Sequence, residues 1–410
     1  MLRYQISTDK LISFLIVILP FSICAGKAVG DITASVIALL YFLRCIYKND
    51  HSYLFESWIK FALILWSYSV IRSLFTEDAI FSLSKSIPWV RFIFFAAAIQ
   101  SFLIQDHRLI KKLLITTSIS AGFLTLDSLI QYFMGKDLFG KPLYDHGNFV
   151  RLTGPFSKMF VGYIITSLSL PIIGFIAYKF SWNKGYRIKS TALMLIVLIT
   201  YVTVFLSGER SAFIQMTAGI MMILIASKYN AGTIIKLIFA IMILQMLLYI
   251  YMPKEFQRQF LSAYHTFRNF NESPYGILWD SGVRLGLNNI FLGVGANNFE
   301  SECLKMASFC RSHPHNIFIE WFAEYGLIGL ILFMTFIVSI LLNIKRFYLG
   351  IETRYHKYIL IGLISAFVVK LLPLPSSGFF KNWYAVPFWF IVGWMMSFKN
   401  PKYSNKKFKY

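Results

Sequence analysis

Long apolar runs separated by short polar segments make up most of this 410-residue chain. A helix needs roughly 20 apolar residues to cross about 30 Å of hydrocarbon, and most runs approach that length. Backbone groups in lipid must be satisfied within their own segment, so we predict a helix for each run. The runs are Leu11–Gly26, Ile32–Tyr47, Ile59–Phe75, Ile87–Ile104, Leu113–Met134, Met159–Phe180, Thr191–Leu206, Ser211–Ala226, Ile234–Met252, Ile317–Ile344, Tyr358–Leu374 and Val386–Phe398. The pattern predicts an all-α integral membrane protein with about 12 transmembrane helices.

Composition supports the same fold class. Hydrophobic residues make up 57% of the chain and charged residues 14%, which leaves too little polar surface for a soluble protein of this size. A net charge of +21 would suggest a nucleic-acid partner in a soluble protein. Here the basic residues lie in short blocks between apolar runs, which is the pattern of membrane topology, so we predict membrane lipids and no nucleic acid as partners. No small-x-small cleavage site precedes Gly26, so we expect the first helix to be retained.

The distribution of lysine and arginine predicts the orientation. With the N-terminus inside, the inner segments carry 23 of the 40 basic residues and the short outer segments carry 11. The remaining six lie in a long loop that is exempt from the positive-inside rule because of its length. We therefore expect both termini in the cytoplasm and the long loop outside.

Four regions follow from these assignments. Residues 1–252 hold transmembrane helices 1–9, and residues 253–315 form a large periplasmic loop region that contains candidate active-site residues. Residues 316–398 hold helices 10–12, and residues 399–410 form a basic cytoplasmic tail. Gly293-Val294-Gly295 in the long loop is a weak nucleotide-binding signal without a preceding strand, and we interpret it as turns between short helices.

Three arginines on the predicted outer side are candidates for binding an anion. Arg210 opens a helix, where backbone amides also favour negative charge, although an arginine at a helix end can simply snorkel. Arg284 lies in the long loop, where pairing with Asp280 on the surface is the simpler interpretation. Arg151 stands three residues before Gly154 in another outer loop, and an exposed arginine in a turn needs no functional explanation.

His315 is the candidate general base. It lies at the start of a predicted helix, where the dipole and nearby arginines should lower its pKa and keep the imidazole neutral. The simpler interpretation is that His315 or Asn316 only caps the helix. Three carboxylates fall within predicted helices, where they are costly without partners, and we expect them to form hydrogen bonds inside the bundle. They are Asp127, Glu320 and Glu324.

Two cysteines in the long loop allow two kinds of chemistry. Cys303, Cys310, His313 and His315 follow a C-x6-C-x2-H-x-H order. This spacing does not fit a common zinc site, and an outer compartment is oxidising. We therefore predict a disulfide between Cys303 and Cys310 and no metal.

The residues from His315 onward resemble a known signature. His315-Asn316, nine residues, Gly326, two residues and Gly329 match the H-[NSQ]-x9-G-x2-[GTY] pattern of bacterial O-antigen ligases. These ligases belong to the O-antigen ligase/polymerase superfamily. The resemblance implies a GT-C-like fold with the large periplasmic loop between helices 9 and 10, and it makes Asn316, Gly326 and Gly329 motif residues.

The three arginines extend the resemblance. Arg210 and Arg284 are similar to the two arginines that the family uses, and Arg151 with Gly154 is similar to a further Arg-x-x-Gly patch. The resemblance implies that they bind a pyrophosphate while His315 acts as the catalytic base. Because the donor sugar already carries an activated pyrophosphate, the family needs no cofactor.

The implied reaction is a glycosyl transfer in lipopolysaccharide biosynthesis. The donor would be a polysaccharide on undecaprenyl pyrophosphate and the acceptor a sugar hydroxyl of the lipid A core, at the periplasmic face of the bacterial inner membrane. The mechanism would be inverting and metal-independent. O-antigen polymerases and other glycan transferases of the superfamily share parts of the signature and stay open as alternatives. A transporter of lipid-linked glycans fits less well, because transporter sites lie near the bilayer midplane, and a non-catalytic scaffold would leave these residues without a shared purpose.

Overall fold

Helices form nearly all of the computed structural model, which describes residues 2–145, 150–182, 187–227, 231–307 and 309–399. The helices are α1 (Leu2–Cys24), α2 (Lys27–Lys48), α3 (Ser57–Ser73), α4 (Ala79–Ser86), α5 (Val90–Gln105), α6 (Arg108–Met134), α7 (Val161–Trp182), α8 (Arg187–Leu206), α9 (Arg210–Ala226), α10 (Ala231–Tyr251), α11 (Pro253–Phe256), α12 (Ser262–Arg268), α13 (Pro274–Asn288), α14 (Phe299–Leu304), α15 (Ile317–Gly350), α16 (Arg354–Lys370) and α17 (Asn382–Met396). The predicted basic tail lies, from residue 400 onward, outside the described residues.

Each predicted apolar run coincides with a helix. Among the described residues, five helical stretches are long and apolar enough to cross a membrane, namely α2, Ala79–Gln105, α6, Val161–Tyr178 and α15. A bent pair formed by α10 and the segment Pro253–Arg268 would make a sixth span. The prediction of a multi-pass α-helical membrane protein is thus confirmed, whereas the count of 12 transmembrane helices stays a prediction.

One short ladder departs from the wholly helical prediction. In the connection between α6 and α7, strand β1 (Tyr144–Asp145) pairs antiparallel with strand β2 (Val150–Arg151), and Tyr144 lies opposite Arg151. A connection of this length satisfies part of its backbone by pairing with itself. The ladder therefore fixes the backbone of Arg151.

Small residues allow the central helices to approach closely. Helices α7 and α16 pack against each other. A Cβ atom on Gly174 would lie 2.4 Å from the carbonyl oxygen of Tyr358, and one on Gly362 would lie 2.5 Å from that of Leu170. Small residues at such crossings let the backbones meet in full van der Waals contact, which is the main attraction between helices in lipid.

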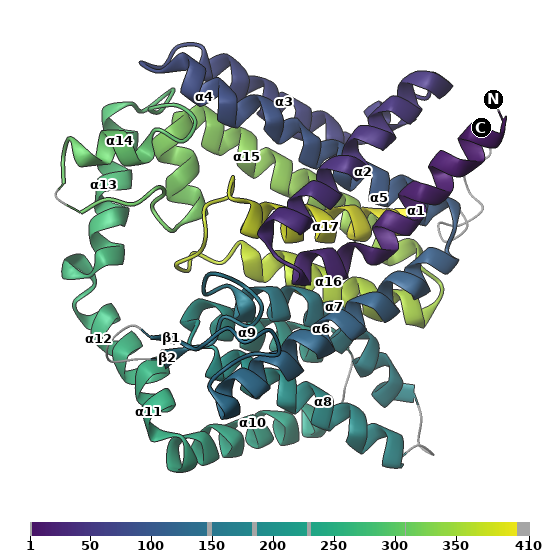
Figure 1. Cartoon of the computed structure of the whole chain (residues 1–410), viewed down its shortest axis with the longest axis vertical. Coiled ribbons are helices and arrows are strands. Elements are labelled where there is room, and N and C mark those ends of the chain that lie inside the picture. Colours follow the sequence, from purple (N-terminus) through teal and green to yellow (C-terminus); the bar gives the residue numbers. More distant parts are fainter. Residues whose placement is uncertain (1, 146–149, 183–186, 228–230, 308, 400–410) are drawn as a thin grey trace.

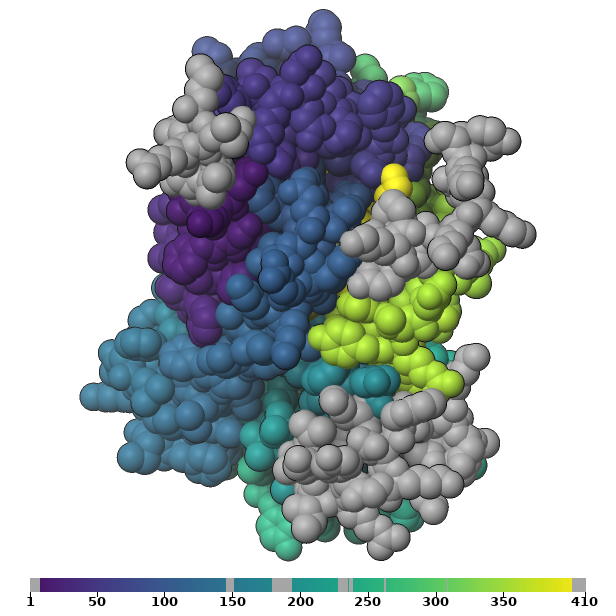
Figure 2. Space-filling model, turned by 90° about the vertical axis from the view of Figure 1, so that its right-hand side faces the viewer, coloured from purple at the N-terminus to yellow at the C-terminus, as the bar shows by residue number. Residues whose placement is uncertain are grey.

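The segment α11–α14 lies along one side of the molecule. Figure 1 shows it on the left, whereas the first residues of α1 lie at the upper right. Figure 2 looks onto the right-hand side of that view, where residues of α1 and α2 (purple) lie beside those of α6 (blue). These helices also pack together, α1 against both α2 and α6. The long polar segment and the start of the chain are therefore on different sides of the bundle.

Candidate functional site

The backbone at the start of α15 is fixed by Asn316. Its side-chain oxygen accepts hydrogen bonds from the backbone N–H groups of Phe318 at 3.0 Å and Ile319 at 3.2 Å. Asn316 is therefore the N-cap of α15, as the simpler interpretation expected. His315, just before the cap, has a φ of 57°, a left-handed conformation that is uncommon for a residue with a side chain and is often found at functional sites.

The imidazole of His315 is held in one tautomer. Its Nδ1 lies 2.9 Å from the carbonyl oxygen of Ser376, and the backbone N–H of Ser376 donates to the carbonyl of His315 at 2.9 Å. A carbonyl can only accept, so Nδ1 carries the hydrogen and Nε2 keeps its lone pair. Burial lowers the pKa of His315, and the charge of Arg311 adds to this effect. The ring is thus neutral and presents a basic Nε2.

His313 is a second neutral imidazole beside the first. The two rings lie with their centroids 4.2 Å apart. Burial lowers the pKa of His313 to about 3, and the charge of Lys381 acts in the same direction. His313 therefore adds no positive charge next to Nε2 of His315.

The connection between α16 and α17 completes the surroundings of His315. Besides Ser376, the backbone N–H of Phe379 donates to a carboxylate oxygen of Glu320 at 2.8 Å, and the Tyr163 hydroxyl donates to the carbonyl of Pro375 at 2.8 Å. Sequence reasoning missed this connection and Tyr163. Its Pro-Ser-Ser-Gly stretch signals only a turn, and nothing in the sequence relates it to His315, some 60 residues earlier.

Arg210 contacts the long segment through α12. It is the first residue of α9, and its Nη1 donates to the hydroxyl of Thr266 on α12 at 3.3 Å. The residue before Arg210, Glu209, accepts a hydrogen bond from the backbone N–H of Tyr163 at 3.2 Å. The structure thus brings the start of α9 and the surroundings of His315 together through Tyr163.

Arg151 lies beside the turn between α8 and α9. Glu209 in this turn is buried, and its carboxylate accepts from the backbone N–H groups of Gly162 at 2.8 Å and Tyr163 at 3.2 Å. Burial raises the pKa of Glu209 to about 7, while the two backbone N–H groups and the charge of Arg151 oppose that rise. A third arginine reaches the same turn, because Arg258 donates to the carbonyl of Leu206 at 3.0 Å.

Arg258 and Glu209 were both missed by sequence reasoning. Arg258 lies in a π-helical turn, Gln257–Leu261, an irregularity that is frequent at functional sites but has no clear sequence signal. Its guanidinium packs on Gly208, where a Cβ atom would come within 2.8 Å of it. In the sequence, Glu209 stands out only because it directly precedes Arg210.

Arg284 is on a helix beside His315, but its side chain faces away. It forms an ion pair with Asp280 at 2.8 Å, and its side chain is 69% exposed. The opposite face of α13 contacts α15, where a Cβ atom on Gly282 would lie 2.4 Å from Ile319. The ring of Tyr275, also on α13, is 5.8 Å from that of His315. The geometry of Arg284 is that of the surface pair that the simpler interpretation expected.

One signature glycine, Gly326, allows a break in α15. Gly326 has a φ of 65° and a ψ of −165°, a conformation essentially restricted to glycine. The break frees backbone groups that bind the segment after α13, with Leu327 N–H donating to the carbonyl of Ile290 and Gly295 N–H to that of Glu324, both at 2.7 Å. The signature therefore also shapes how the long segment docks on α15.

We expect Gly326→Ala to destabilise the protein strongly. A Cβ atom there would lie 2.4 Å from the backbone of Phe291, and the backbone conformation itself would cost about 1–3 kcal/mol. Thermal unfolding in detergent should show a lower midpoint for this variant. Gly122→Ala is the matched control, because a Cβ atom on Gly122 in the middle of α6 meets nothing within 4 Å. An equal midpoint for both variants would contradict the role of the break.

The three carboxylates predicted within helices all have partners. An oxygen of Asp127 accepts from the backbone N–H of Leu138 at 2.9 Å, and one of Glu324 accepts from that of Asn297 at 2.9 Å. Glu320 holds the α16–α17 connection, as described above. Each partner is a backbone amide of a connecting segment, so the carboxylates anchor loops at helix ends.

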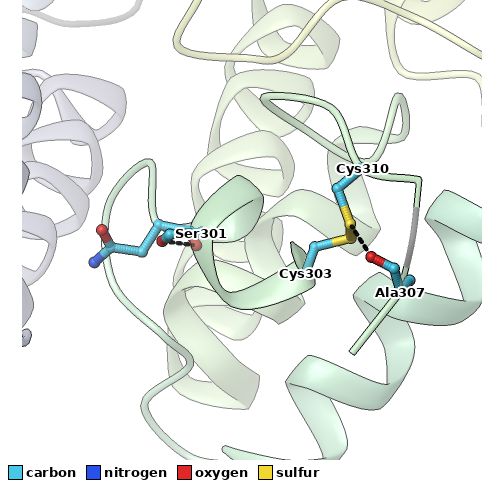
Figure 3. The surroundings of a disulfide bond; sticks show 5 residues. Ser301, Cys303, Ala307 and Cys310 are labelled. Carbon is cyan, nitrogen blue, oxygen red and sulfur yellow. Dashed lines mark hydrogen bonds between the residues drawn. A yellow bond between two sulfur atoms is a disulfide. The ribbon is translucent and has the colours of Figure 1, made fainter. Parts of the chain in front are cut away.

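A disulfide joins the two cysteines of the long segment. Cys303, on α14, is bonded to Cys310, and their Cα atoms are 5.9 Å apart. Figure 3 shows the bond at the end of α14 beside Ala307, whose carbonyl lies 3.7 Å from the sulfur of Cys310. The bond closes a short ring five residues before His315. Among the described residues, no group of three or more His, Cys, Asp or Glu side chains is arranged to hold a metal ion.

Comparison with known proteins finds a family similarity in the middle part of the chain. The sequence profile of the O-antigen ligase family matches residues 192–334. This range contains Arg210, Arg258, Arg284 and His315, and both signature glycines.

Other comparisons add little. No curated protein matches the chain in sequence. A solved structure described as "Structural coordination of polymerization and crosslinking by a peptidoglycan synthase complex" contains a similar chain, with a TM-score of 0.48 and 12% sequence identity over 83% of this chain and 95% of that chain. A similarity this low supports no conclusion. The family match, by contrast, confirms the resemblance seen in the sequence: residues 192–334 of this chain are similar to the O-antigen ligase family.

Proposed function

We propose that this protein is an O-antigen ligase. It transfers a polysaccharide from undecaprenyl pyrophosphate to a sugar hydroxyl of the lipid A core. In this proposal the enzyme lies in the bacterial inner membrane with both termini in the cytoplasm, and the segment of residues 253–315 and the active site face the periplasm. The observation that carries the proposal is the oriented, neutral imidazole of His315 within the family-matched region.

His315 is the general base of the proposed reaction. Its Nε2 takes the proton of the acceptor hydroxyl as the acceptor oxygen forms a bond to the anomeric carbon of the donor sugar. The bond from that carbon to the pyrophosphate oxygen breaks at the same time, and the undecaprenyl pyrophosphate leaves with the electron pair. Attack opposite the leaving group inverts the configuration. The Ser376 carbonyl, which holds Nδ1–H, stabilises the imidazolium that forms.

Arginines neutralise the departing pyrophosphate. Arg210 and Arg151 lie around the α8–α9 turn, on the side that Tyr163 links to His315. A guanidinium can hold two phosphate oxygens at once, which suits a group whose negative charge increases as the bond breaks. The side chain of Arg284 faces away from His315 in this structure, so it joins this set only by turning and exchanging its exposed partner, Asp280, for phosphate. An exposed ion pair contributes little stability, so the exchange has a low cost.

The rate of transfer should stay high as the pH falls through 6.5. Histidine ordinarily titrates at about 6.5, and the lowered pKa of His315 keeps the base neutral below that value. The acid limb of the kcat/KM profile should therefore lie below pH 6.5. An inflection near pH 7 would belong to Glu209 and should disappear in Glu209→Gln. An acid limb above pH 6.5 that persists in Glu209→Gln would contradict a burial-lowered base.

An O-antigen polymerase is the second candidate, because it would use the same donor and an equivalent base. The two differ in the acceptor, which is a lipid A core sugar for a ligase and a second lipid-linked repeat unit for a polymerase. A carrier of lipid-linked glycans would need arginines but no oriented base. The contacts of His315 therefore favour an enzyme over a carrier.

Transfer in detergent tests the proposal. Purified protein receives labelled polysaccharide on undecaprenyl pyrophosphate together with lipid A core, or with unlabelled lipid-linked repeat units, each with and without EDTA. We expect label on lipid A core with or without the chelator. Label only on lengthened donor would assign a polymerase. Loss of activity with EDTA that added metal restores would contradict the metal-independent mechanism.

A further inference from the structure

Tyr163 connects two parts of the proposed site. Its hydroxyl donates to the carbonyl of Pro375 at 2.8 Å, and its backbone N–H donates to the carboxylate of Glu209 at 3.2 Å. Glu209 directly precedes Arg210, and Pro375 belongs to the connection that orients His315. A single residue thus contacts both the arginine segment and the base segment.

Glu209 fixes the first turn of the helix that carries Tyr163. Its two carboxylate oxygens accept from the backbone N–H groups of Gly162 and Tyr163, which are among the free amides at the start of α7. The contact is tight, because a Cβ atom on Gly162 would lie 2.6 Å from the hydroxyl of Ser207. The α8–α9 turn and the start of α7 therefore have little freedom to move apart.

The α16–α17 connection depends on such contacts because it is not helical. It is held on one side of Ser376 by Tyr163, through Pro375, and on the other side by Glu320, through Phe379. The peptide between these two contacts pairs with His315 in both directions. Its orientation decides where the imidazole points.

We propose that Tyr163, anchored by Glu209, is a positioning residue. It holds the imidazole of His315 at a fixed position relative to Arg210. The inference rests on the proposed function for its effect on catalysis. Tyr163 does not exchange a proton with the substrate. It holds the Ser376 carbonyl in place, and this carbonyl in turn selects the tautomer and direction of the base.

Removing the Tyr163 hydroxyl should lower kcat without changing the KM for the donor. The carbonyl of Pro375 would lose its donor, and the imidazole of His315 would lose its fixed direction. Small misplacements of a catalytic group can cost up to about 100-fold in rate, and we expect about a 10-fold loss of kcat for Tyr163→Phe. Donor binding depends on the arginines, so its KM should stay within about twofold.

Tyr358→Phe is the matched control. The hydroxyl of Tyr358 also donates to a backbone carbonyl at 2.8 Å, that of Ser227, but at the other end of α16. Both variants lose one equivalent hydrogen bond and should unfold at similar temperatures. Full kcat in Tyr163→Phe, or an equal loss in Tyr358→Phe, would overturn the positioning role.

The tautomer of the His315 imidazole can be measured without catalytic turnover. Nitrogen NMR of protein labelled at its seven histidines, with His315→Gln to assign the signal, reports which ring nitrogen carries the hydrogen. We expect the Nδ1–H form in the wild type and in Tyr358→Phe, and a mixture of tautomers in Tyr163→Phe. An unchanged Nδ1–H signal in Tyr163→Phe would refute the inference even if activity fell.

An inactive wild type and an unfolded Tyr163→Phe variant are two further outcomes, and each still leaves a test of the positioning role. If wild-type protein transfers no glycan to any acceptor, the proposed function fails, and the imidazole signal alone decides the positioning role. If Tyr163→Phe does not fold, Glu209→Gln is the second variant, because the amide retains the size but can accept from only one of the two backbone N–H groups. It should then show the same mixture of tautomers, and a wild-type signal would overturn the proposal.

Discussion

Replacing His315 with alanine should abolish glycan transfer while leaving donor binding nearly intact. A positioned general base contributes about 10²–10⁴-fold to the rate, and the neighbouring imidazole cannot take its place. His313, the neighbouring ring, is too weak a base because burial lowers its pKa to about 3. The measurement is single-turnover transfer of labelled polysaccharide, with donor binding followed separately on the same protein.

His313→Ala is the informative companion to this variant. If His315 is the base, His313→Ala should retain measurable transfer. The pH profile of its kcat/KM should have the same acid limb as that of the wild type. Full activity in His315→Ala would refute the assignment of the base. Loss of donor binding in that variant would instead assign His315 to substrate binding.

Arg210→Lys should lose about 10²–10³-fold in kcat although the charge is kept. This is the range for removing one group that stabilises developing negative charge in a transition state. A lysine ammonium is a point charge that cannot hold two phosphate oxygens in the way a planar guanidinium can. Arg284→Lys should also fail, since its guanidinium must form the same contacts after leaving Asp280.

Arg108→Lys provides the control for this pair. Its ion pair with Asp106, with a side chain that is 88% exposed, resembles that of Arg284 but lies at the start of α6. Transfer by this variant should equal that of the wild type. Unchanged activity in both Arg210→Lys and Arg284→Lys would show that neither guanidinium binds the pyrophosphate.

The apolar runs determined the helices by themselves. Burial of backbone polar groups in lipid allows few alternatives to a helix, so the pattern of long runs was enough to place α2, α6, α7 and α15. The signature around His315 was also readable, because it is local. Asn316 and Gly326 act on one helix, through its cap and its break.

Only the tertiary structure decided what surrounds the base. Tyr163 at the start of α7, Glu209 in the α8–α9 turn and Ser376 in the α16–α17 connection are far apart in the chain, and none of them belongs to a pattern. Their relation to His315 depends on how α7, α9 and α16 pack, which is set by shape and close contact rather than by periodicity. For the same reason the sequence could name Arg284 as a candidate but not the direction of its side chain. That direction follows from which face of α13 lies against α15.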